Sequence, residues 1–103
     1  MTWTDEQRQE LSRNVAEKFS LKIFLPHGFI DGADVGGWLH DDWHTIMELC
    51  EKHGVWVKPV IAKSLFIYID DKWNNSVFYA DHNYDANLAE RIARMMALME
   101  VEL

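Results

Sequence analysis

The feature that most constrains the fold is an apolar run of five residues, Leu65-Phe66-Ile67-Tyr68-Ile69. Side chains alternate between the two faces of a strand, so a run that is apolar on both faces is typical of a central strand. Flanking strands are predicted over residues 55–62 and 77–80. Pro59 lacks a backbone N–H, which places the first of these at an edge or a bulge. An Asp- and Asn-rich turn over residues 70–76 is expected to join the central strand to the last one.

A helix over residues 4–19 is predicted at the amino-terminal end. Thr4 followed by Gln7 is a capping-box signal, in which each side chain bonds the other residue's backbone N–H. The apolar residues of this helix recur every four positions: Leu11, Val15 and Phe19. A short strand over residues 21–25 follows, and Pro26 ends it.

Two further helices are predicted, over residues 38–53 and 86–102. Gly54 suits a left-handed cap after the first of them, and Asp85 suits the N-cap of the second. The apolar face expected for the earlier helix consists of Leu39, Trp43, Ile46, Met47 and Cys50. For the last helix we expect Leu88, Ala89, Ile92, Met96 and Met99 to be buried, with Glu90, Arg91 and Arg94 on the opposite side.

These elements define an α+β fold in the order α-β-α-β-β-β-α. We expect a mostly antiparallel sheet of about four strands with three helices packed on it. No repeat, low-complexity tract or linker interrupts the 103 residues. Residues 1–103 are therefore predicted to form a single domain, which is an ordinary size for one.

The charge of the chain is strongly negative and unevenly distributed. Six acids and no Lys or Arg lie between residues 31 and 51, so this segment supplies −6 of the net charge of −7. The six are Asp31, Asp34, Asp41, Asp42, Glu48 and Glu51. This balance argues against direct binding to nucleic acid or to anionic membranes. A solvated face, a cation site and a surface that mimics nucleic acid to inhibit a basic protein all remain open.

The sequence also bears on the compartment. No apolar run approaches the roughly 18–20 residues that span a bilayer. The amino terminus lacks the basic and apolar regions of a signal peptide. Cys50 is the single cysteine, which excludes an internal disulfide. We therefore expect a cytoplasmic protein that does not associate with membranes.

Two groups of residues could carry enzymatic chemistry. His40, His44 and Glu48 recur every four residues, a spacing that can chelate a divalent metal on one side of a helix. No cofactor is predicted otherwise. A polar junction lies between the last strand and the last helix, and its residues are Asp81, His82, Asn83 and Tyr84. A histidine beside an aspartate can act as an oriented base, so Asp81, His82 and Tyr84 are the alternative hydrolytic site. The competing interpretation leaves His82 as an exposed turn residue and packs Tyr84.

The loop over residues 26–37 holds four of the five glycines. Its length of about 12 residues is typical of functional loops. It contains no basic residue and no Gly-Lys-Ser/Thr ending, so it does not match a phosphate-binding fingerprint.

Five tryptophans are many for a chain of this length. Three helices can hardly cover both faces of the sheet, so one face is expected to stay open as a ligand cleft or a subunit interface. The residues expected on this surface are Trp56, Phe66, Tyr68, Trp73 and Phe78. We therefore expect a small acidic binding module rather than an enzyme, homodimeric through this aromatic face or an edge strand. A partner protein or a small molecule is the alternative occupant.

Overall fold

The computed structural model describes residues 2–21, 23–24, 29–30, 33–34, 39, 42–61 and 63–103. Within them the fold is α+β, with three α-helices and two antiparallel sheets of three strands each. The helices are α1 (Asp5–Lys18), α2 (Trp43–His53) and α3 (Ala86–Glu100). The main sheet consists of β4 (Val55–Val60), β5 (Ser64–Ile69) and β6 (Lys72–Phe78), and a 3-10 helix, η2 (Tyr79–His82), follows it.

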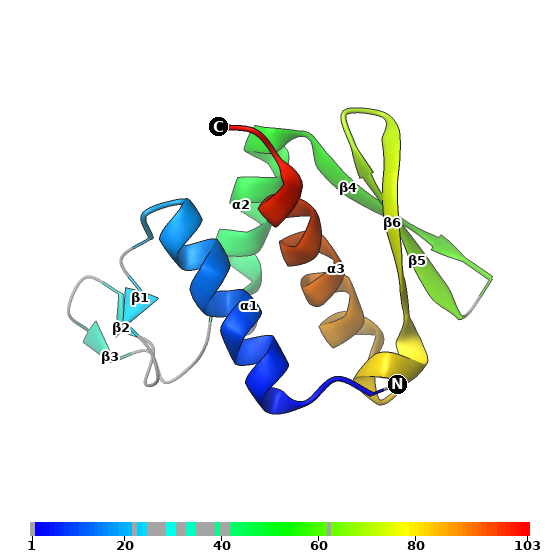
Figure 1. Cartoon of the computed structure of the whole chain (residues 1–103), viewed down its shortest axis with the longest axis horizontal. Helices are drawn as coiled ribbons and strands as arrows, with labels where there is room; N and C mark the ends of the chain where they lie inside the picture. The colour runs from blue at the N-terminus through cyan, green and yellow to red at the C-terminus, as the bar shows by residue number, and fades with distance from the viewer. Residues whose placement is uncertain are drawn as a thin grey trace.

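Helix α3 is the centre of the molecule. It contacts α1, α2 and all three strands of the main sheet, and Figure 1 shows it between the other two helices and the sheet. Its fully buried residues include three alanines, Ala89, Ala93 and Ala97. Their small side chains let the neighbouring elements approach the helix closely. The sequence predicts one buried side of α3 with Arg94 opposite it, but α3 is buried on more than that side. Met95 and Leu98 are buried as well, and Arg94 is mostly covered.

The helix ends follow the capping residues. Thr4 accepts from the Gln7 N–H and the Gln7 side chain accepts from the Thr4 N–H, which confirms the capping box. Asp85 accepts from the Leu88 N–H at the start of α3. At the other end of α3, the Lys18 ammonium of α1 donates to three carbonyl oxygens. Those three belong to Leu98, Met99 and Val101, and this contact ties α1 to α3.

Gly54 ends α2 in the left-handed conformation, with φ of 71°, as the sequence predicts. Its carbonyl accepts from the Asp70 N–H at 2.9 Å. The carboxylate of Asp70 occupies the space that a Cβ would take here and could rotate away, so the site requires glycine for its backbone conformation. This contact fixes the end of α2 against the β5–β6 hairpin.

The strand order β4-β5-β6 confirms that β5 is central and that β4, with Pro59, is an edge. The predicted turn over residues 70–76 is wrong, because β6 already begins at Lys72. Asp70 and Asp71 both have positive φ, 49° and 69°, and this two-residue geometry matches the twist of a hairpin. The polar residues after them therefore belong to an edge strand, whose open side tolerates them.

The predicted first strand does not join the main sheet. It is present as β1 (Ile23–Phe24) and pairs instead with β2 (Phe29–Ile30), which pairs with β3 (Ala33–Asp34). The main sheet therefore has three strands rather than about four, because β1 finds its partner close by in the sequence. Strands β2 and β3 lie within residues 26–37, for which the sequence predicts a loop. The rest of that loop lies outside the described residues.

Helix α2 begins at Trp43, where Asp42 is the N-cap and accepts from the Thr45 N–H. Most of the predicted beginning, residues 38–42, lies outside the described residues. Ile46 and Cys50 are buried as expected. Trp43 is not a core residue: it is exposed, and the Arg94 guanidinium lies over its ring at 5.6 Å from the centroid.

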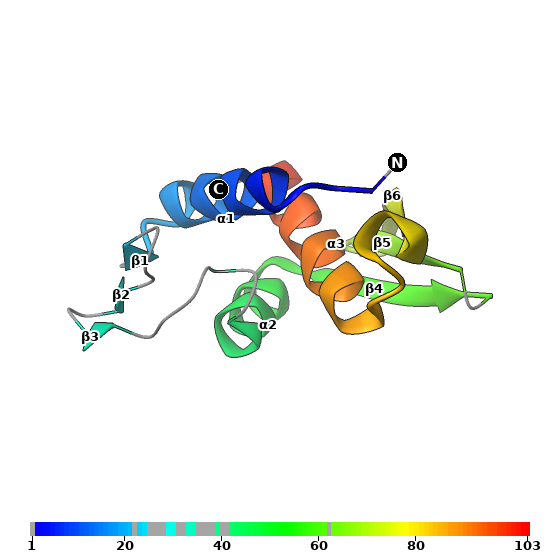
Figure 2. The same ribbon diagram turned by 90° about the horizontal axis from the view of Figure 1, so that it is seen from below.

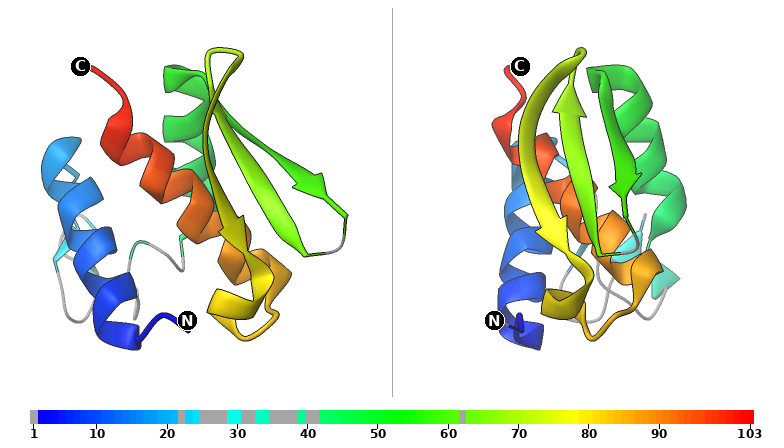
Figure 3. Two further views of the ribbon diagram at one scale, coloured as in Figure 1. Left: turned by 45° about the vertical axis from the view of Figure 1, so that its right-hand side comes forward. Right: turned by 90° about the vertical axis from the view of Figure 1, so that its right-hand side faces the viewer.

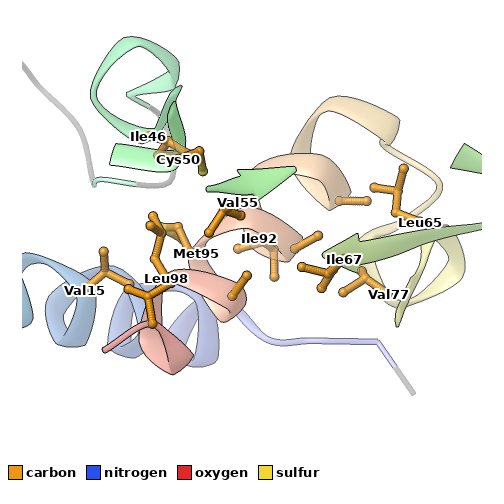
Figure 4. Packing of buried hydrophobic residues seen from close by; sticks show 14 of the residues in the cluster. Val15, Ile46, Cys50, Val55, Leu65, Ile67, Val77, Ile92, Met95 and Leu98 are labelled. Carbon is orange, nitrogen blue, oxygen red and sulfur yellow. The ribbon is translucent and has the colours of Figure 1, made fainter. Parts of the chain in front are cut away.

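The inner face of the main sheet forms the core together with the helices. Val55, Leu65, Ile67 and Val77 project from it toward Ile92 and Met95 of α3, as Figure 4 shows. Figure 2 shows the helices gathered along one side of these strands. No helix in the described part of the chain combines the length and apolarity needed to cross a membrane.

Candidate functional site

The outer face of the main sheet is the side turned away from α3. Register places Trp56, Tyr68 and Trp73 side by side across the three strands, on the same face as Phe66 and Phe78. These five residues are called the outer face below. In the right-hand view of Figure 3 the strands lie in front of the helices, and no helix crosses them. The structure therefore brings the five predicted surface residues together.

The rings of the outer face are ordered by contacts with one another. Trp56 and Tyr68 stack with centroids 4.1 Å apart and planes 6° from parallel. Phe66 meets Trp73 edge-on, with centroids 6.3 Å apart. Cross-strand aromatic pairs of this kind stabilise a sheet by about 0.2–1 kcal/mol each. The contacts therefore preform the surface while leaving its outer side open.

Exposure is concentrated on the two edge strands. Trp56 is 39% exposed, Trp73 57% and Phe78 55%, whereas the two rings of β5 between them are half-buried. A large aromatic side chain presents about 150–250 Å², so these three rings expose roughly 300 Å². That is the size at which a patch on a monomer is often functional. Lys58 is the one charged residue among the strand positions on this side.

The polar junction separates into a buried part and an exposed part. His82 is fully buried and its Nδ1 accepts from Arg8 Nε at 3.3 Å, which makes the imidazole neutral with its proton on Nε2. Burial, reinforced by the Arg8 charge, lowers the pKa of His82 to about 4, although Asp81 opposes this. His82 Nε2 and Arg8 Nη2 are buried without a hydrogen-bond partner in the described structure. No local pattern predicts the contact between Arg8 and His82, because the two residues are 74 positions apart.

The remaining junction residues point elsewhere. Tyr84 is 78% exposed, and both it and Asn83 have positive φ. The structure therefore separates the exposed Tyr84 from the buried His82. The competing interpretation is wrong as well, because it expects His82 to be exposed and Tyr84 to be packed. The Asp81 carbonyl accepts from the Trp3 N–H at 2.8 Å, and the Trp3 ring lies 5.3 Å from the His82 ring. The junction thus anchors the amino-terminal segment.

The predicted metal-binding row is only partly described. His44 Nε2 and Glu48 Oε1 are 2.7 Å apart, and both side chains are strongly exposed on α2. His40 lies outside the described residues. In the part of the chain that the structure describes, no group of three or more His, Cys, Asp or Glu residues is arranged to hold a metal. A divalent cation at this row remains a prediction.

Cys50 faces Arg94 inside the molecule. Burial raises the pKa of its thiol, while the hydrogen bond and charge of Arg94 act in the opposite direction. A protonated, inaccessible thiol is a poor nucleophile, so Cys50 behaves as a small core residue. Elsewhere between α2 and α3, Trp43, Asn87 and Arg91 line a cavity of about 230 Å³.

No family model matches the chain, and neither a curated protein nor a solved structure is significantly similar to it. What the protein does must therefore be inferred from its own residues. Among the large hydrophobic residues exposed in the described part, three belong to the outer face and Ile61 lies in the adjoining β4–β5 connection. The outer face is accordingly the surface with the clearest physical reason to bind something.

Proposed function

We propose that the protein is a small interaction module that forms a homodimer through the outer face. The observation that carries the proposal is the exposure of Trp56, Trp73 and Phe78 on a face that no described helix covers. Exposed aromatic area contacts water unfavourably, and a contiguous patch of it marks an interaction site. The inner face uses the same strands to build the core, so the outer rings are not needed for it.

A second copy of the chain is the occupant that fits the charges. The chain has a net charge of −7, so two copies repel each other at most orientations. The strand positions on the side of the outer face include no acid and a single cation, Lys58, so two copies can approach there with little repulsion. Flat aromatic faces are also self-complementary about a twofold axis, the commonest symmetry of soluble dimers.

The size of the patch sets the strength of the dimer. Two copies that bury roughly 300 Å² of ring surface each gain about 15 kcal/mol at 25 cal/mol per Å². Association costs about 4–15 kcal/mol in lost freedom of motion. The contact is also smaller than the roughly 800 Å² per partner of a stable complex. The dimer is therefore expected to be weak and concentration-dependent.

Sedimentation velocity over a concentration series tests the proposal. The wild-type protein is expected to move from monomer toward dimer as its concentration rises. Phe78→Ser removes an exposed ring from the outer face and is expected to keep the protein monomeric throughout. Tyr84→Ser is the control, because it removes an aromatic ring that is even more exposed, 78% against 55%, and lies outside the sheet.

Two results would contradict the homodimer. One is a wild-type protein that stays monomeric at the highest concentration. The other is a dimer that Tyr84→Ser weakens as much as Phe78→Ser does. Trp56→Lys provides an independent check, since a buried ammonium at the twofold contact is costly.

A further inference from the structure

The cavity of about 230 Å³ between α2 and α3 is lined by Trp43, Asn87 and Arg91. Trp43 is the first residue of α2, and Asn87 and Arg91 are one turn apart near the beginning of α3. Residues four apart on a helix lie on the same side of it, so the two side chains of α3 form one wall. None of the three residues belongs to the outer face, and the cavity is therefore separate from the proposed dimer contact.

Arg91 is a half-buried cation whose donors are not satisfied by the protein. Its Nε is buried and has no hydrogen-bond partner in the described structure. The described residues also include no acid that forms an ion pair with its guanidinium. Leaving a buried donor of a charged group without an acceptor is costly. An acceptor that enters the cavity would remove this cost, so the state of Arg91 points to a ligand.

Arg94 adds a second guanidinium beside the cavity, one turn further along α3. It lies over the Trp43 ring, 5.6 Å from the centroid, and its Nε is likewise buried without a hydrogen-bond partner. Glu90 is its acidic neighbour, but the two side chains are 3.8 Å apart, which is longer than a hydrogen bond. Cationic donors thus outnumber the acids that contact them here, and this arrangement favours an anionic ligand.

Two acids limit the charge that this ligand can carry. Asp42 and Asp85 are the N-caps of α2 and α3, and their side chains accept from the N–H groups of Thr45 and Leu88. Both are close to the cavity in the sequence, so they repel a dianion such as phosphate more than a monoanion. A carboxylate carries one charge, and its two oxygens match the planar fork of the Arg91 guanidinium.

The Trp43 ring and the volume of the cavity limit the rest of the ligand. Sites for drug-sized compounds occupy roughly 300–1,000 Å³, so this smaller cavity suits a small compound. Trp43 is 40% exposed, and its indole gives the cavity an apolar wall. Planar and aromatic groups pack well against such a ring.

We propose that this cavity binds the carboxylate of a small planar or aromatic acid, with Arg91 as its counter-charge, Asn87 as a further donor and Trp43 as its apolar wall. A free acid of low molecular mass and the carboxyl-terminal residue of a peptide both present this chemistry. The proposal does not rest on the homodimer, because none of the three residues lies on the outer face.

An NMR titration with sodium benzoate at constant protein concentration tests the proposal, with benzamide as the uncharged isostere. Benzoate is expected to shift the Trp43 indole signal and the amides of residues 87–91 saturably, while the signals of Trp56 and Trp73 stay fixed. Benzamide is expected to leave all of them in place. No saturable shift with benzoate, or an equal response to benzamide, would overturn the proposal. Tighter binding of inorganic phosphate than of benzoate would overturn the choice of a carboxylate.

Asn87→Asp locates the site without disturbing the core, because Asn87 is exposed. The new carboxylate in the cavity wall repels the ligand, and benzoate binding is expected to weaken about tenfold. Asn14→Asp is the matched control, since it makes the same change at an exposed position of α1. Unchanged affinity in Asn87→Asp, or an equal loss in Asn14→Asp, would overturn the assignment to this cavity.

Arg91→Gln tests the counter-charge directly. Benzoate binding is expected to weaken at least tenfold, as the loss of a charge-assisted contact. Arg13→Gln is its matched control, because Arg13 is an exposed arginine of α1. Circular dichroism checks that both variants are folded. A folded Arg91→Gln variant that binds benzoate as the wild type does would overturn the role given to Arg91.

Two further measurements separate this site from the dimer and identify the source of the ligand. Phe78→Ser is expected to bind benzoate as the wild type does, and loss of binding would overturn the placement of the site between α2 and α3. The tripeptide Gly-Gly-Phe has an aromatic residue with a free terminal carboxylate. Tighter binding of benzoate than of this peptide would assign the site to a free acid. The reverse order would assign it to a peptide terminus, and both orders support a carboxylate ligand.

Discussion

The two faces of the main sheet have similar side chains and opposite surroundings. Leu65 and Ile67 of β5 are buried against α3, whereas Phe66 and Tyr68 alternate with them on the other face and contact the rings of Trp73 and Trp56. The alternation of one strand thus supplies the core on one side and an open aromatic surface on the other. Substitutions on the inner face should therefore lower the stability of the fold, and substitutions on the outer face should change self-association.

The largest expected effect is on the inner face. Ile67→Ala removes a fully buried side chain between β5 and α3. The free energy of unfolding is expected to fall by about 3–4 kcal/mol, from lost burial and the cavity left behind. Urea denaturation followed by circular dichroism measures this. A loss below about 1 kcal/mol would break the comparison, because the inner face would then behave like an exposed one.

The buried junction is expected to make stability depend on pH. The pKa of His82 is lowered from 6.5 to about 4 by burial and by Arg8, so the unfolded chain binds a proton that the folded chain excludes. Stability is therefore retained above pH 6.5 and lost as the pH falls toward 4. The expected loss from pH 7 to pH 5 is about 2 kcal/mol.

Urea denaturation at the two pH values measures that loss. His82→Gln is expected to reduce the pH dependence by this amount, although it lowers stability at pH 7. His44→Gln is the control, because His44 lies on the exposed side of α2. An equal pH dependence in wild type and His82→Gln would show that His82 is not the group responsible.

A smaller effect is expected at the end of α3. Lys18→Met keeps the alkyl chain but removes the ammonium that donates to three carbonyl oxygens. The free energy of unfolding is expected to fall by about 1–2 kcal/mol, since three carbonyl oxygens lose their charge-assisted hydrogen bonds. Thermal denaturation compares it with Lys52→Met, an exposed lysine of α2. Equal melting temperatures would contradict the role given to Lys18.

The smallest stability effect is expected on the outer face. Phe78→Ser should lower the free energy of unfolding of the monomer by about 1 kcal/mol, because more than half of the residue already contacts water and only the covered part of the ring is lost. The same urea denaturation, performed at low concentration, measures it. A loss comparable to that of Ile67→Ala would mean that both faces are core, and the distinction between them would fail.

Local patterns predicted much of the fold. The capping box at Thr4, the left-handed cap at Gly54 and the central position of β5 depend on residues close in sequence, and the structure confirms each. The hairpin turn was misjudged because Asn74 and Asn75 resemble turn residues by composition. Asp70 and Asp71, both with positive φ, complete the turn before the chain reaches these asparagines. The asparagines therefore lie in an edge strand.

Contacts between distant segments could not be predicted. The bond from Arg8 to His82 and those from Lys18 to the end of α3 join residues more than 70 positions apart. Alternation did place Phe66 and Tyr68 on a common side, because side chains along one strand alternate. Trp73 joins them only because β6 begins at Lys72, inside the segment that the sequence predicts as a turn. What binds there stays a proposal.

The most direct test of the outer face as the self-association surface uses the tryptophan indole N–H signals. In a dilution series of the wild-type protein, the signals of Trp56 and Trp73 are expected to shift with concentration, while those of Trp3 and Trp43 stay fixed. Shifts at Trp43 with none at Trp56 would contradict the account, as would signals that all remain unchanged.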